Sequence, residues 1–383
     1  MSVLGLLAFI LFQTPDPVAE LQARIDSGNV KLEFHGERGY LDSLLTNLKI
    51  PVSSQTLVFS KTSLQSERIS PKTPRALYFN DDVYVAWVQG ASVVEIMSVD
   101  PRRGSIFYGL PQEEAPRPQF EQSTGHECSV CHHSQESKKF SPLLLFSSVL
   151  PDATGNVEGT FPIPTTDQSP MIERWGGWYV TGTHGNQRHL GNIIAKTPAS
   201  AFGSQLPAAE FARSSNVTDL KGRFDTTRYP SPHSDIVALM VLAHQVEVHN
   251  LIALAGAKPD VPPQETGEPL VKAMLFAGAV PLAAPIQGTS TFTTDFASQG
   301  PRDARGRSLR DFDLKTRLFR YPLSYVIYSK NYDEMPEGVR AYVRRRLQEV
   351  LTGQDKSPDF AHLSTADRTA ILEILGETKE GYR

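Results

Sequence analysis

The chain has 383 residues, of which 40% are hydrophobic and 21% charged. That apolar fraction is high enough to bury a sizeable core, which excludes wholesale disorder. Thirty-eight Lys and Arg residues against 42 Asp and Glu residues leave a net charge of -4, which argues against a strongly basic nucleic-acid binder.

The N-terminus carries a short apolar run, residues 3–12. It is too short to cross a bilayer, which takes about 20 residues, but it has the length of a signal-peptide core. A basic residue before the run and a small-residue cleavage site are both missing, so a buried N-terminal helix or strand is the alternative. We predict that residues 1–14 are a signal peptide and that the mature chain has no transmembrane span.

Residues 15–118 are predicted to form a β-rich module. The module opens with a helix over 17–26, a strand over 30–34 and a short amphipathic helix over 41–48. Short runs rich in Val, Ile, Tyr and Phe then alternate with turn residues, a pattern typical of an antiparallel meander. These runs are residues 55–60, 76–79, 83–88, 93–99 and 105–110. The proline-containing stretch 111–118 is expected to be a linker.

The rest of the chain divides into a mixed segment, 119–200, and a helical region, 201–383. The mixed segment contains both cysteines, a possible buried strand over 143–149 and an aromatic run over 175–180 that is also predicted to be a strand. Helices are predicted over 232–255, 269–280 and 338–351, with a last one starting at Ser364, where Asp367 completes a capping box. A strand-rich front and a helical back, without regular alternation, predict an α+β fold.

The two cysteines, Cys128 and Cys131, carry the main functional signal. Residues 128–132 read C-S-V-C-H, the attachment signature of c-type haem. Two thiols at this spacing can each form a thioether with one haem vinyl group, and His132 is then held against the iron as its proximal axial ligand. A zinc site would need further ligands at finger spacing, which do not follow, and a redox C-x-x-C would need a βαβ unit. A structural disulfide stays open. The motif predicts one covalent haem c.

On Cys128, Cys131 and His132 the chain resembles a monohaem c-type cytochrome. The resemblance is confined to this motif: the chain is far longer than a small electron carrier, and residues 133–135 read H-S-Q instead of starting a glycine-rich loop. The resemblance implies haem attachment outside the cytoplasm. We therefore expect a periplasmic or otherwise extracytoplasmic protein with a redox partner protein, and no nucleic-acid partner.

The sixth iron ligand has two leading candidates, His184 and Met171. His184 follows the aromatic run in the turn T-G-T-H-G, where glycine allows a close approach to a flat macrocycle. Met171 resembles the distal methionine of small c-type cytochromes, but methionine also fills cores. We favour His184, with an apolar haem wall supplied by the aromatic run. The wall residues would be Trp175, Trp178 and Tyr179. His189 is a weaker candidate.

Two histidines on the predicted helix 232–255, His244 and His249, are the next candidates. Five residues turn a helix through about 140°, so these two cannot chelate one metal. His244 shares a face with Glu247, which predicts a buried His–Glu pair; the alternative is that one of the histidines faces the haem. The arginine-rich stretch 302–320 is either a solvated loop or a partner for haem propionates or an acidic protein.

The sequence thus predicts an exported c-type cytochrome that transfers electrons in the cell envelope. One alternative is a haem enzyme, peroxidase-like or an oxidase of a small reductant, with an open or displaceable distal site. Another is a haem sensor or a subunit of a respiratory assembly. The chain length favours the enzyme, because a soluble shuttle needs only about 100 residues.

Overall fold

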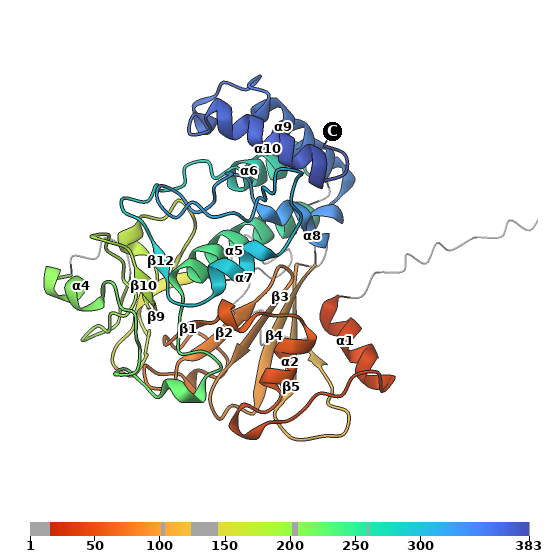
Figure 1. Cartoon of the computed structure of the whole chain (residues 1–383). Coiled ribbons are helices and arrows are strands. Elements are labelled where there is room, and N and C mark those ends of the chain that lie inside the picture. The colour runs from red at the N-terminus through yellow and green to blue at the C-terminus, as the bar shows by residue number, and fades with distance from the viewer. Residues whose placement is uncertain (1–15, 101–103, 124–144, 201–205, 259, 383) are drawn as a thin grey trace, which may run out of the picture.

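The computed structural model describes residues 16–100, 104–123, 145–200, 206–258 and 260–382. The predicted α+β class is confirmed. Strands dominate the front of the chain and helices the back, as Figure 1 shows. The signal peptide predicted for residues 1–14 lies outside the described residues.

The central element is an antiparallel sheet of seven strands in the order β6-β5-β4-β3-β2-β1-β9. The predicted meander is confirmed. Its strands are β1 (Thr56–Val58), β2 (Arg75–Phe79), β3 (Val83–Trp87), β4 (Val93–Asp100) and β5 (Gly104–Pro111). Both edge strands come from the mixed segment and have two residues each: β6 (Glu121–Gln122) and β9 (Trp178–Tyr179).

The smaller strands form two further sheets. One has the order β11-β7-β8, and the other pairs β10 with β12. Their bounds are β7 (Ser147–Leu150), β8 (Ile163–Pro164), β10 (Gly182–Thr183), β11 (Ala199–Ser200) and β12 (Gln287–Gly288). The predicted strand 143–149 therefore corresponds to β7, which starts later.

Helices cover both faces of the large sheet. In the described chain they are α1 (Pro17–Asp26), α2 (Leu41–Asn47), α4 (Ala208–Ser214), α5 (Ile236–Ala257), α6 (Pro263–Met274), α7 (Phe292–Ser298), α8 (Lys330–Asp333), α9 (Glu337–Leu351) and α10 (Thr365–Thr378). The N-terminal helices α1 and α2 share one core with one face of the sheet, and α5 shares the other core with the opposite face. Figure 1 shows α5 between the sheet and the C-terminal helices.

Alternation along the strands separates the two cores. Tyr78 and Val85, paired across β2 and β3, face the core of α1 and α2. Their neighbours Phe79 and Tyr84, also paired, face α5. Because side chains of a strand point to alternate faces, one apolar sheet supports both layers.

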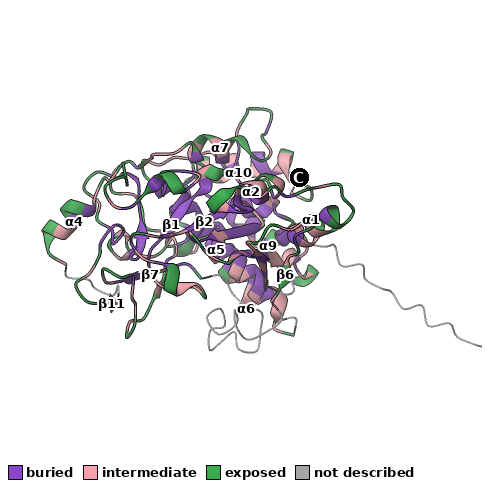
Figure 2. Cartoon of the chain, turned by 90° about the horizontal axis from the view of Figure 1, so that it is seen from below, coloured by how far each residue is buried: buried purple, intermediate pink, exposed green. Residues whose placement is uncertain are grey.

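Helix α5 is buried along most of its length, as the purple centre of Figure 2 shows. Its 22 residues are long and apolar enough to cross a membrane, but most of the helix is buried inside the protein. A helix that is apolar on all sides is typical of a protein core. The sequence placed its start four residues too early, because Asp235 is the N-cap: its side chain accepts from the amides of Val237 and Ala238.

Three local predictions were wrong. Residues 30–34 form no ladder in the described chain; this extended stretch crosses α2, where the Glu33 amide donates to the Ser43 hydroxyl. The aromatic run 175–180 forms only the two-residue strand β9. The helix predicted over 269–280 is α6, Pro263–Met274, and Pro269 lies inside it. The helix can begin at Pro263 because proline at the first helical position costs no hydrogen bond. The capping box of Ser364 and Asp367 is confirmed.

The cap of α5 also anchors a second segment of chain. One Asp235 oxygen accepts from the two α5 amides at 2.8 and 3.4 Å. The other accepts from the amides of Thr289 and Ser290 at 2.9 and 2.8 Å, and from the Ser290 hydroxyl at 2.8 Å. Asp235 itself is fully buried.

Replacing Asp235 by alanine is expected to lower the free energy of unfolding by about 3 kcal/mol, because a helix cap is lost and buried amides lose their acceptor. Chemical denaturation measures this change. Asp225→Ala is the control: Asp225 also caps a short helix, but it is exposed, so its loss should be much smaller. Equal losses in the two variants would contradict the prediction.

Candidate functional site

The haem-attachment residues Cys128, Cys131 and His132 lie outside the described residues, within 124–144. The described chain approaches this segment at Ser123, whose amide donates to the Phe107 carbonyl of β5 at 2.9 Å. It resumes at Leu145, ahead of the buried Phe146. The candidates for the sixth ligand all lie in the described part of the chain.

His184 directly follows β10, and its neighbours Thr183 and Gly185 are exposed. His184 itself is fully buried. The following Gly185 has φ +61, and a Cβ there would lie 2.7 Å from that of Ala284, so this close approach requires glycine. The Asn216 side chain holds the loop, because its oxygen accepts from the His184 amide at 2.7 Å.

His184 and His189 form a buried histidine pair. Their Nε2 atoms lie 3.1 Å apart. The main-chain N–H of Asn216 also donates to the His184 Nε2, at 3.0 Å. That nitrogen therefore acts as the acceptor, and the His189 Nε2–H is the donor. The Nδ1 atoms of both rings are buried without a hydrogen-bond partner. Burial lowers the pKa of His189 to about 3 and also lowers the pKa of His184, so both rings are neutral at physiological pH.

This pairing bears on iron ligation by His184, because coordination uses an imidazole lone pair. The Nε2 lone pair of His184 already receives two N–H groups. Ligation through this atom would require both hydrogen bonds to break. That His184 is the sixth iron ligand stays a prediction, and ligation through Nε2 would cost the protein two buried hydrogen bonds.

Met171 begins a short 3-10 helix, Met171–Glu173, and is half-buried against the core that contains α5. The predicted aromatic wall does not form one surface. Trp175 and Trp178 belong to the core of α5, whereas Tyr179 faces the core of α1 and α2. The Tyr179 hydroxyl donates to the Pro71 carbonyl at 2.7 Å. Alternation along β9 sends neighbouring side chains to opposite faces.

His244 has a carboxylate partner, but this partner is Asp167 and not the predicted Glu247. The His244 Nδ1 lies 2.6 Å from an Asp167 oxygen, and its Nε2 lies 2.8 Å from the Ser324 hydroxyl. Its ring stacks on Phe276 at 4.2 Å. The sequence missed Asp167 because it lies 77 residues from His244, and only tertiary folding brings the two together.

Asp167, His244 and Ser324 have the connectivity of a hydrolase triad. Ser324 is fully buried, however, and its hydroxyl also accepts from the Val326 amide at 3.3 Å as a helix cap. A nucleophile has to be within reach of its substrate. The arrangement therefore acts as a buried support that ties α5 to the segment after α7.

His249 belongs to a second buried network on α5. Its Nδ1 lies 3.0 Å from the Tyr84 hydroxyl. Gln245 donates to that hydroxyl at 2.7 Å and to the Asn80 carbonyl at 2.8 Å, and it accepts from the Tyr325 hydroxyl at 2.5 Å. The His249 Nε2 is buried and has no hydrogen-bond partner. Burial lowers the pKa of His249 to about 3, so this ring is neutral.

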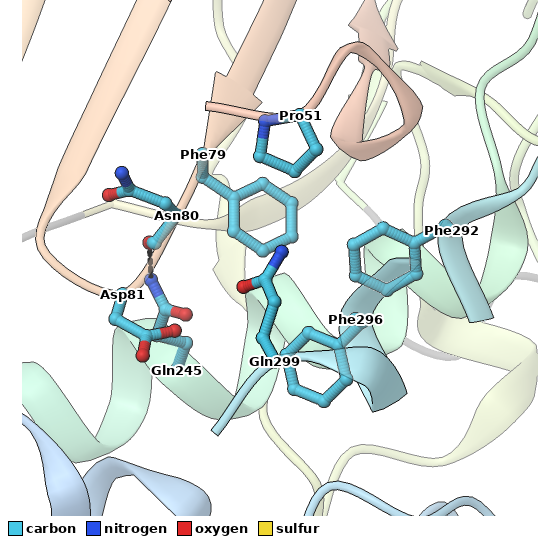
Figure 3. A pocket seen from close by; sticks show the side chains of 8 residues that line it. All are labelled: Pro51, Phe79, Asn80, Asp81, Gln245, Phe292, Phe296 and Gln299. Carbon is cyan, nitrogen blue, oxygen red and sulfur yellow. Dashed lines mark hydrogen bonds between the residues drawn. The ribbon is translucent and has the colours of Figure 1, made fainter. Parts of the chain in front are cut away.

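A small cavity lies beside this network (Figure 3). It has room for about one water molecule. Its lining residues are Pro51, Phe79, Asn80, Asp81, Gln245, Phe292, Phe296 and Gln299. Asp81 pairs with the buried Arg310, whose guanidinium carbon lies 4.5 Å from the ring centre of Phe296 and 4.4 Å from that of Tyr325. The cavity is too small for a cofactor.

The arginines of 302–320 are mostly engaged with carboxylates of the same chain. Besides Arg310, they form ion pairs between Arg302 and Asp311, Arg305 and Glu373, Arg307 and Asp303, and Arg317 and Asp367. These bonds give the stretch a structural role within the C-terminal region. In the part of the chain that the structure describes, no group of three or more His, Cys, Asp or Glu side chains is placed to hold a metal ion.

No family model, curated protein or solved structure matches this chain. The C-x-x-C-H motif and the geometry of the described residues are therefore the basis of the proposed function.

Glu247 follows His244 by three residues on α5 and is half-buried. Burial raises its pKa to about 7, helped by the charge of Asp167 and opposed by those of His244 and Arg174. A carboxyl whose pKa is higher in the folded state makes its full contribution to stability below its unfolded pKa, near 4. That contribution is lost as the pH rises through about 7.

Glu247→Gln, which keeps the uncharged shape, is expected to exceed the wild type in stability by about 2 kcal/mol at pH 8 and to match it near pH 4. Unfolding measured across this pH range tests the prediction. Glu268→Gln is the control of opposite sign: its hydrogen bond from Arg346 lowers the Glu268 pKa, so this variant should lose stability at neutral pH. A Glu247→Gln profile parallel to the wild type would refute the assignment.

Proposed function

We propose that the protein is an exported c-type cytochrome that binds one haem covalently and transfers electrons in the cell envelope. This proposal depends on one observation, the sequence C-S-V-C-H at residues 128–132. Cys128 and Cys131 would form the thioethers, and His132 would be the proximal ligand. When bound, the haem supplies the one-electron couple, and the protein sets its potential through the axial ligands and their surroundings.

The described part of the chain supports this proposal with neutral imidazoles. His184, His189 and His249 all have lowered pKa values caused by burial. A neutral imidazole keeps the lone pair that iron ligation needs, whereas a protonated one does not. At His184 this lone pair would first have to give up its two hydrogen bonds.

The first test is whether the haem is covalent. Protein matured in a host that assembles c-type cytochromes should keep a haem stain after denaturation and acid–acetone extraction. The double variant Cys128→Ser, Cys131→Ser should lose it, because no thioether can form. His133→Ala is the matched control in the same stretch and should keep the stain. Extractable haem in the wild type would overturn the proposal.

The second test concerns export. The mature chain is expected to begin between Phe12 and Val18, because c-type haem is attached outside the cytoplasm and the apolar run has signal-peptide length. The intact mass of protein purified from its own host measures this. A mass that includes residues 1–12 would contradict cleavage at this position.

A further inference from the structure

Asp16 is the N-cap of helix α1. One oxygen of its carboxylate accepts from the main-chain N–H groups of Val18 and Ala19, at 3.0 and 3.2 Å. The main-chain carbonyl of Asp16 accepts from the Glu20 amide at 2.9 Å. Pro17, at the first helical position, has no N–H to satisfy. Asp16 therefore provides acceptors for all the N–H groups at the start of the helix that have no partner within it.

The second oxygen of the Asp16 carboxylate connects the helix to the sheet. It accepts from the hydroxyl of Tyr108 on β5 at 2.7 Å, in a buried contact. Asp16 is only 6% exposed. A carboxylate is buried at low cost only when hydrogen bonds replace its water, and Asp16 has such bonds on both oxygens. Asp16 thus belongs to the folded core and not to a terminal tail.

The body of α1 is built into the same core. Val18, Leu21 and Ile25 are buried at helical spacing in the cluster that α1 shares with the sheet. The helix also holds the chain that leads into β6, because the Gln22 side chain accepts from the Phe120 amide at 2.7 Å. A chain without the first turn of α1 would lose the cap and part of this packing together.

The sequence offers a competing processing position inside this first turn. Signal peptides are cut after a small residue that follows the apolar run. A full A-x-A pattern is missing, but Ala19 meets the requirement at the last position and is the only alanine between residues 13 and 22. Cleavage after Ala19 would start the chain at Glu20 and remove both Asp16 and Val18. The pattern and the fold therefore favour different boundaries.

We propose that the processing protease leaves Asp16 in the mature chain and cuts no later than the bond between Pro15 and Asp16. This inference rests on the export in the proposed function, and it narrows the expected start, between Phe12 and Val18, to residues 12–16. The cut is a hydrolysis: water adds across one peptide bond and leaves a carboxyl group on the leader and an amino group on the mature chain. The helix cap and its bond to the sheet set the limit.

The test is N-terminal sequencing and intact mass of the full gene product purified from its own host. The first residue is expected within residues 12–16. A chain that begins at Pro17 or later, such as at Glu20, would overturn the inference, and so would a chain that begins within residues 1–11. Acid–acetone extraction of the same sample scores the haem separately. A covalent haem on a chain that starts at Glu20 would therefore overturn this inference while the proposed function stands.

A matched pair of variants separates the two cutting positions. Ala19→Gln replaces the small residue by one that is too large for a cleavage position but favourable in a helix, and Ala19 is only half-buried. The mature mass should change by the substitution alone. Ala23→Gln is the control, because it makes the same change one turn later at an exposed position. A leader retained in Ala19→Gln but removed in Ala23→Gln would overturn the inference.

A second pair of variants tests the structural reason. Asp16→Ala removes the cap of α1 and the acceptor of the Tyr108 hydroxyl, so the melting temperature should fall by several degrees. Glu20→Gln lies in the same turn, but Glu20 is exposed, so this control should stay within about 2 °C of the wild type. Equal melting temperatures for the two variants would show that the fold does not need Asp16, which would overturn the proposed boundary.

Discussion

The structure depends on the burial of one helix, α5, which is apolar on nearly every side. Such a helix has to be covered all round, because each exposed apolar side chain would forfeit about 1.5–3 kcal/mol. The seven-stranded sheet covers one side, and α6 and α7 pack against others. The two N-terminal helices, α1 and α2, cover the opposite face of the sheet. The layer order of the whole protein follows from these requirements.

Apolar burial alone does not decide how α5 is rotated, because a helix without a polar face has no preferred side. The polar residues His244, Gln245 and His249 supply that preference. Each has to find partners inside the core, since a buried polar group without a hydrogen bond is costly. Gln245 and His249 turn toward Tyr84 of the sheet, and His244 toward Asp167 and Ser324. These bonds fix the helix against three distant segments of chain.

The same requirement distinguishes the buried histidines. His244 has both nitrogens engaged, and the pair of His184 and His189 engages one nitrogen of each. His249 has its Nδ1 beside the Tyr84 hydroxyl, and the neighbouring Gln245 has both its side-chain oxygen and its side-chain nitrogen hydrogen-bonded.

The sequence by itself determined the class of the fold and most of the meander, and it is the basis of the haem proposed at residues 128–132. Strand alternation, turn residues and the C-x-x-C-H spacing are local patterns, and local patterns can be read without a structure. The sequence also located the capping box at Ser364. Only the tertiary structure decided the partners of the buried histidines. Asp167 reaches His244 across 77 residues and Tyr84 reaches His249 across 165. Contacts over such separations arise from how the layers pack, and no local spacing encodes them.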